Sequence, residues 1–148
     1  MSLKLAANNV IEALREISHD NQIQKKIVDI SEEIINNSQL GKFSLIFGNG
    51  GSAADAQHLS AEFLVRLRPQ INRKPIPVIS LALDTSTITA CGNDFGFDFL
   101  FERNLKALGQ KDDLLICIST SGNSKNLVLA AEYALKAGIK VVGFLGGK

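Results

Sequence analysis

The chain has 148 residues, of which 45% are hydrophobic and 21% charged, and its formal net charge is +1. This length suffices for one domain with a buried core, and the near-neutral charge gives no electrostatic argument for a nucleic-acid or membrane partner. The N-terminus lacks the layout of a signal peptide, and no apolar run approaches the roughly 20 residues of a membrane span. We therefore expect a single cytoplasmic domain, residues 1–148, with no nucleic-acid and no membrane partner.

Two amphipathic helices are predicted ahead of the first strand. Apolar residues recur at three- and four-residue steps over residues 3–17 and again over 23–34, and the polar stretch around Asp20 separates the two runs. The second helix should end near Gly41. Both apolar stripes need a partner surface, so we expect residues 1–40 to pack in an oligomer.

From residue 41 onward, strands and helices are predicted to alternate. Strands are expected at four apolar segments, 43–47, 78–83, 114–119 and 141–145. Helices are expected between them, at 52–67, in one or two pieces across 85–108, and at 124–136. Because the strands are apolar almost throughout, as in sheets covered on both faces, the pattern predicts an α/β fold with a doubly wound parallel sheet over residues 41–148.

Several side chains are predicted to lie in the core. Cys91 and Cys117 are not a CxxC pair and each sits in an apolar stretch, so we expect buried, reduced thiols. Phe97, Phe99 and Phe101 are expected to anchor the start of a helix in the core.

A glycine-rich turn at residues 48–51 follows the first strand and leads directly into a helix. Glycine allows close backbone approach, so successive N–H groups can converge on an anion beside the helix N-terminus. On that helix, Asp55, His58 and Glu62 are spaced to share one face. The arrangement suggests a phosphorylated small molecule beside a metal or acid–base site.

Polar clusters follow three of the predicted strands, where open parallel sheets bind ligands. They are residues 49–52, residues 84–87 with Asn93 and Asp94 further on, and residues 119–124 with four hydroxyls. Hydroxyl and backbone N–H donors at a helix N-terminus suit a phosphate. A serine-rich helix cap is the alternative, although one cap needs only one hydroxyl.

A metal site is incompletely specified by these residues alone. His58 could be a surface histidine and Glu62 a solvated carboxylate, and two ligands fall short of the three or four that zinc takes from a protein. The only other histidine, His19, is expected in an exposed turn between the two leading helices.

Three segments match a known pattern: GNGGSAADAQHLSAEF at 48–63, CGNDFGFDFLFERNLKALG at 91–109, and ISTSGNSKNLVLAA at 118–131. With them the chain resembles the sugar isomerase (SIS) superfamily and, within it, the phosphoheptose isomerase family, from about Ile27 onward. The first segment, with His58 and Glu62 in register, is highly specific, whereas the third is common across the superfamily.

The resemblance implies a flavodoxin-like sandwich, a homotetramer and active sites between subunits. It implies one Zn²⁺ per subunit, held in part by His58 and Glu62, with Glu62 also the catalytic base. The substrate-binding residues that it implies are Glu62 with Asn49, Gly50, Gly51, Ser52, Asn93, Asp94, Ser119, Thr120, Ser121 and Ser124, the last four holding the phosphate.

The implied reaction converts sedoheptulose 7-phosphate to D-glycero-D-manno-heptose 7-phosphate through an enediol(ate), in heptose biosynthesis for lipopolysaccharide or surface polysaccharide. One departure from the family concerns its last strand and helix, which carry a glutamine and a histidine that complete the metal site. This sequence stops at Lys148, so we expect a C-terminally truncated sandwich with half of the metal site.

Two other interpretations remain open. A non-catalytic SIS module would bind a sugar phosphate or a protein partner, as in the replication initiator-associating type, although Glu62 favours the enzyme. A nucleotide-binding domain is disfavoured because the glycine turn lacks GxGxxG spacing and no lysine follows it as in a P-loop.

Overall fold

The computed structural model describes residues 2–82 and 84–146. The chain divides into two compact units, Met1–Glu33 and Ile34–Lys148, and the second contains the sheet. In chain order the elements are α1 (Leu3–His19), α2 (Asn21–Gln39), β1 (Ser44–Gly48), α3 (Gly51–Leu64), β2 (Val78–Ser80), α4 (Thr85–Asp94), the 3₁₀ turn η1 (Phe97–Phe99), α5 (Leu100–Leu108), β3 (Leu114–Ser119), α6 (Lys125–Lys136) and β4 (Lys140–Leu145).

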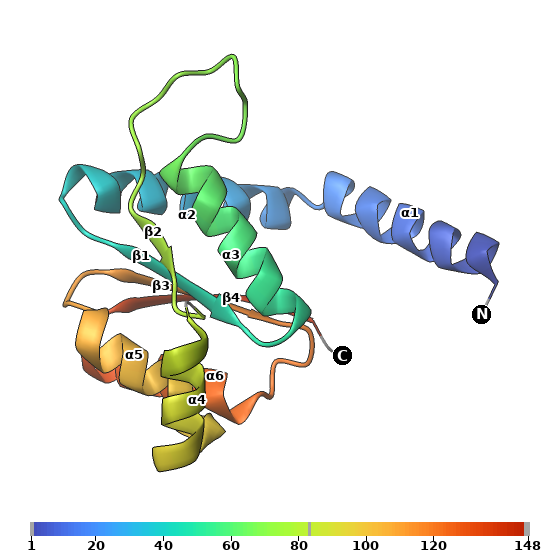
Figure 1. Cartoon of the computed structure of the whole chain (residues 1–148). Helices are drawn as coiled ribbons and strands as arrows, with labels where there is room; N and C mark the ends of the chain where they lie inside the picture. Colours follow the sequence, from blue (N-terminus) through green and yellow to red (C-terminus); the bar gives the residue numbers. More distant parts are fainter. Residues whose placement is uncertain (1, 83, 147–148) are drawn as a thin grey trace. The chain divides into compact units, whose positions relative to one another are not determined.

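The four strands form one parallel sheet in the order β2-β1-β3-β4. Helix α3 lies on one face of this sheet, and α4, α5 and α6 lie on the other (Figure 1). The predicted doubly wound α/β architecture is therefore confirmed.

The break between the two leading helices lies at Asp20, as predicted. Its backbone is extended, and its carboxylate accepts hydrogen bonds from the N–H groups of Gln22 (2.8 Å) and Ile23 (3.0 Å) at the start of α2. An acceptor in this position satisfies donors that a new helix leaves unpaired.

Helix α1 has no buried residue, so the partner surface expected for it stays a prediction. Among the described residues, no helix has the length and apolar character needed to cross a membrane.

The main hydrophobic core lies between the sheet and helices α5 and α6. Phe47 of β1 packs on Phe101 of α5 with ring centroids 4.6 Å apart, and both side chains are fully buried. Cys91 and Cys117 are buried free thiols, which confirms the prediction for both. Burial in this apolar setting raises the pKa of Cys117 to about 12.

The expectation that three phenylalanines anchor the core is wrong for two of them. Phe97 and Phe99 are 53% and 43% exposed, whereas Phe101 is buried. Gly96 has φ +89 and turns the chain into η1 before α5 begins, so only the residue that enters α5 faces inward.

Two elements are shorter than predicted. Helix α3 ends at Leu64 instead of residue 67, where the guanidinium of Arg73 binds backbone carbonyls of its last turn. Strand β2 ends at Ser80 because the chain then turns toward α4, whose N-cap is Asp84. The predicted strand extended to Leu83, which lies outside the described residues.

Candidate functional site

The strand order places a topological switch point between β1 and β3. The chain passes from β1 to β2 on one side and returns across β1 to β3 on the other, so the connections diverge at this pair. The register pairs Gly48 with Ile118, and Asn49 and Ser119 follow at adjacent places on the sheet edge. Open α/β sheets bind ligands in the crevice that such a divergence creates.

The turn after β1, residues 48–51 (the glycine turn), depends on two glycines for different reasons. A Cβ at Gly48 would lie 2.6 Å from Cβ of Ser52 and 2.7 Å from the carbonyl oxygen of Ile118, so only glycine fits there. Gly50 caps α3 with φ +56 and ψ −120, a conformation that glycine adopts readily and other residues do not. Helix α3 then begins at Gly51, one residue before the predicted start.

Helix α3 presents a small-residue face to the sheet and its reactive side chains on the other side. Ala56 and Ser60 are buried, and the Ser60 hydroxyl donates to the carbonyl of Val78 at 2.7 Å. Nε2 of His58 lies 3.7 Å from Oε1 of Glu62, with side chains 73% and 27% exposed. The two side chains thus meet on one face, as their spacing predicts.

Two cavities flank His58. One of about 360 Å³ is lined by Asp55, His58, Leu59, Ile118 and Phe144. The other, of about 300 Å³, is lined by His58, Leu59, Glu62, Phe63, Leu67 and Arg73. Asp55, His58 and Glu62 of α3 therefore border open space that a small molecule or an ion can enter.

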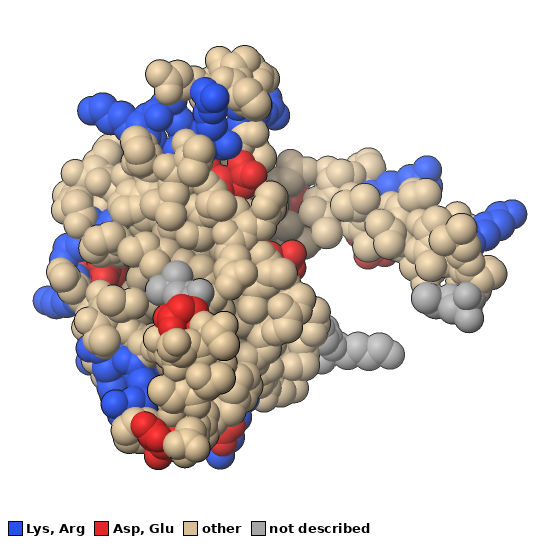
Figure 2. Space-filling model, viewed as in Figure 1, with Lys and Arg blue, Asp and Glu red and all other residues tan. Residues whose placement is uncertain are grey.

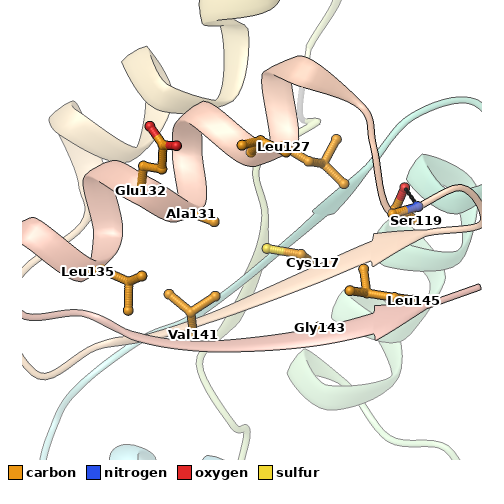
Figure 3. A pocket seen from close by; sticks show the side chains of 11 residues that line it. Cys117, Ser119, Leu127, Ala131, Glu132, Leu135, Val141, Gly143 and Leu145 are labelled. Atoms are coloured by element: carbon orange, nitrogen blue, oxygen red, sulfur yellow. Dashed lines mark hydrogen bonds between the residues drawn. The ribbon is translucent and has the colours of Figure 1, made fainter.

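A third cavity, of about 300 Å³, lies on the opposite face of the sheet. Its lining comes from α6, β3 and β4 and is almost wholly apolar, with Leu135, Val141 and Cys117 facing the space between them (Figure 3). Ser119 and Gly122, which also belong to the loop after β3, line part of this cavity, but the lining as a whole has no cluster of donors for a phosphate or a sugar.

The loop after β3, residues 119–124 (the hydroxyl loop), uses two of its hydroxyls locally. Oγ of Ser119 accepts from the N–H of Gly122 at 3.1 Å, and Oγ of Ser121 accepts from the N–H of Asn123 at 3.3 Å. Ser124 occupies the N-cap of α6, yet its side chain makes no capping hydrogen bond. The helix-cap interpretation therefore does not account for the Ser124 hydroxyl, and Thr120 is exposed.

Asn93 and Asp94 are not brought to this edge of the sheet within one chain. They lie at the end of α4, about 13 Å along the helix axis from its start after β2. Asn93 donates to the Asp94 carboxylate at 2.7 Å, and both side chains are exposed. At the start of the same helix, hydrogen bonds from Thr87 lower the pKa of Asp84 below its ordinary value.

Sequence reasoning missed two residues that shape the site. Asn126 in the first turn of α6 forms a reciprocal amide pair with Asn49, and its place just after the serine-rich segment was the available signal. Arg73 donates to the carbonyls of Phe63 (2.8 Å), Lys74 (2.9 Å) and Glu62, and nothing in the sequence pattern indicated this. Arg73 belongs to the basic loop between α3 and β2, where Lys and Arg side chains gather (Figure 2).

The donor types of His58 and Glu62 suit zinc, which binds imidazole nitrogen and carboxylate oxygen. Within residues 2–82 and 84–146, no group of three or more His, Cys, Asp or Glu side chains is placed to hold a metal ion. His19 is at the end of α1, with Nδ1 2.7 Å from the carbonyl oxygen of Arg15. The described residues thus bring together two side chains of the donor types that zinc binds.

Comparisons with known proteins agree with this architecture. The SIS domain family model matches residues 7–146. A phosphoheptose isomerase of Clostridium acetobutylicum is 47% identical over 136 residues, 92% of this chain and 68% of that protein. One from Campylobacter concisus is 55% identical over 106 residues, 72% of this chain and 55% of that protein. The chain thus spans between about half and two thirds of the length of these curated relatives.

Solved structures give the same result. A phosphoheptose isomerase from Francisella tularensis superposes with a TM-score of 0.86 at 33% identity, covering 100% of this chain and 78% of that one. A phosphoheptose isomerase from Neisseria gonorrhoeae gives 0.82 at 34% identity, covering 98% and 75%. The resemblance seen in the three sequence segments is confirmed: the chain belongs to the SIS domain family and, within it, to the phosphoheptose isomerases.

Proposed function

We propose that the chain binds sedoheptulose 7-phosphate and isomerises it to D-glycero-D-manno-heptose 7-phosphate. The observation that carries this proposal is the convergence of the glycine turn and the hydroxyl loop at the switch point, beside the helix that bears His58 and Glu62. The loop offers hydroxyl and N–H donors for the phosphate, and α3 borders space for the sugar.

In this proposal Glu62 moves the proton. Its carboxylate removes a proton from C1 of the ketose, which yields an enediolate with its charge on O2. O2 then takes up a proton and O1 loses its own, and return of the first proton to C2 leaves the carbonyl at C1. The pair of His58 and Glu62 would hold a Zn²⁺, which when bound would act as a Lewis acid at the developing oxyanion. Ligands beyond this pair would be needed to complete such a centre.

A homotetramer with active sites between subunits belongs to the same proposal. Support comes from apolar side chains that α1 leaves exposed, with Leu3 at 87% and Leu14 at 61%, and from Phe97 at 53%. The position of Asn93 and Asp94, remote from the sheet edge of their own chain, agrees with a role in a neighbouring subunit's site. We propose a cytoplasmic role in supplying heptose for lipopolysaccharide or surface polysaccharide.

A second candidate function is sugar-phosphate binding without turnover. It is favoured by one observation, the lack of a third His, Cys, Asp or Glu beside His58 and Glu62 in the described part of the chain. Both candidates share the binding loops and differ only in proton transfer.

The experiment that separates them follows binding and proton exchange independently. The 148-residue chain is incubated in D₂O with sedoheptulose 7-phosphate, with and without Zn²⁺, and NMR follows ligand binding, deuterium at C1 and the aldose product. We expect binding, exchange and turnover in the wild type. Binding without exchange would support the second candidate, and a failure to bind would refute both.

Glu62→Gln tests the proposed base directly. This variant keeps the size of the side chain and loses the basic oxygen, so it should bind the sugar phosphate while exchange falls by at least about 100-fold, the ordinary contribution of a general base. Glu132→Gln on α6, at the apolar cavity of the opposite face, is the matched control and should exchange as the wild type does. Exchange at the wild-type rate in Glu62→Gln would remove Glu62 from the base role.

A further inference from the structure

Two asparagine side chains join the glycine turn to the start of α6. Nδ2 of Asn49 donates to Oδ1 of Asn126 at 2.9 Å, and Nδ2 of Asn126 donates to Oδ1 of Asn49 at 2.9 Å. Asn126 is 3% exposed and Asn49 is half-buried. Each amide thus faces the other in a closed, two-bond pair.

This pair lies just past the edge of the sheet, where the backbone pairing between β1 and β3 no longer joins the glycine turn to the segment after β3. The backbone register between β1 and β3 ends with Gly48 opposite Ile118. Beyond that point the chain departs on one side into α3 and on the other into the hydroxyl loop and α6. The amide pair links the two departures 77 residues apart in sequence.

The pairing also orients Asn49. A primary amide has two N–H donors and a carbonyl with two lone pairs, and the pair uses one donor and one acceptor of each side chain. Because oxygen faces nitrogen in both directions, neither amide can rotate by half a turn alone without losing both bonds. The pairing therefore fixes the plane of the Asn49 amide at the sheet edge.

We propose that Asn126 is a positioning residue that fixes the separation between the glycine turn and the hydroxyl loop, so that one sugar phosphate can contact both. This inference rests on the proposed function, because it presupposes a ligand whose phosphate and sugar ends meet different loops. Inorganic phosphate is short enough to contact the hydroxyl loop alone and serves as the probe that should not sense the separation.

The test compares the affinities of the 148-residue chain for sedoheptulose 7-phosphate and for inorganic phosphate by NMR titration. Asn126→Ala removes both amide bonds. Asn126→Leu has the same number of side-chain heavy atoms, adds no charge beside the hydroxyl loop and cannot hydrogen-bond Asn49, so it tests the pair without opening a cavity. We expect either variant to lose about tenfold in sugar-phosphate affinity, the order that one or two hydrogen bonds supply, and less than about twofold in phosphate affinity.

Asn104→Ala is the matched control for loss of a partly buried asparagine. Nδ2 of Asn104 donates to the carbonyl of Leu81 at 2.9 Å, and the residue lies on α5, away from both loops. It should lose stability without changing either affinity. Sugar-phosphate affinity that is unchanged in both Asn126 variants, or that falls by the same factor as phosphate affinity, overturns the positioning role. A wild-type chain that fails to bind the sugar phosphate overturns the proposed function itself.

Discussion

Three glycines in one turn should respond differently to the same substitution, because the structure requires glycine at Gly48 and Gly50, for different reasons, and not at Gly51. At Gly48 the added methyl carbon would meet Cβ of Ser52 at 2.6 Å and the carbonyl oxygen of Ile118 at 2.7 Å, about 1 Å inside ordinary contact. One neighbour is the backbone of β3 and the other is the first turn of α3. Neither can move without disturbing hydrogen bonds of the sheet or the helix.

The expected losses follow from these distances. Gly48→Ala should lower the free energy of unfolding by about 3 kcal/mol, the upper end for overpacking, which corresponds to a melting temperature roughly 6–12 °C lower. Gly50→Ala meets no atom within 4 Å. It still forces alanine to φ +56 and ψ −120, a strain of about 1–3 kcal/mol.

Gly51→Ala is the matched control within the same turn. Its Cβ meets nothing within 4 Å, and the residue is the first of α3. Alanine reduces the freedom of the unfolded chain, so stability should be unchanged or rise by about 0.5–1 kcal/mol. Thermal and urea unfolding followed by circular dichroism should rank Gly51→Ala at or above the wild type and Gly48→Ala lowest. A Gly48→Ala variant that melts with the wild type would refute the close-contact argument.

Two further predictions concern buried groups of the core. Because burial raises the pKa of Cys117 from 9.0 to about 12, the unfolded thiol ionises above about pH 9 while the folded one stays neutral. Urea unfolding should show stability falling as pH rises through that range, and Cys117→Ala should lack this part of the slope; an identical slope in the variant would contradict it. Asp113 is fully buried and accepts from the N–H groups of Phe43 (3.0 Å) and Gln110 (2.8 Å), so Asp113→Ala should cost about 1–3 kcal/mol for each orphaned donor. Asp113→Asn retains one acceptor and should lose less by the same urea titration, and equal losses would mean that the charge of the carboxylate, and not the number of acceptors, decides the cost.

Local chemistry explains why most of the fold was predictable. The break at Asp20 comes from a side chain that caps the next helix two and three residues on. In the glycine turn, the backbone conformation of Gly50 likewise caps the start of α3 directly after β1. Such features depend on neighbours in sequence, so a single sequence reveals them.

The differences arise where distant residues decide the outcome. Helix α3 stops early where Arg73, ten residues beyond Phe63 in sequence, binds its last carbonyls. The alternating phenylalanines suggested a buried run, but the positive φ of Gly96 rotates two of them outward. In the site, spacing alone placed His58 beside Glu62, whereas the amide pair of Asn49 and Asn126 depends on the register between β1 and β3, which no local pattern encodes.

The two halves of the candidate site are ordered to different degrees. The binding half is held by the sheet register, by the close contact at Gly48 and by the amide pair between Asn49 and Asn126. The reactive half consists of side chains on an open helix face. There His58 and Glu62 lie 3.7 Å apart, and the interaction free energy of such an exposed pair is only about 0–1 kcal/mol. A bound ion, a ligand or a second surface must therefore supply the order that proton transfer requires. We therefore expect the two loops to bind the sugar phosphate by themselves, and we expect exchange at C1 to report whether His58 and Glu62 have been brought into place.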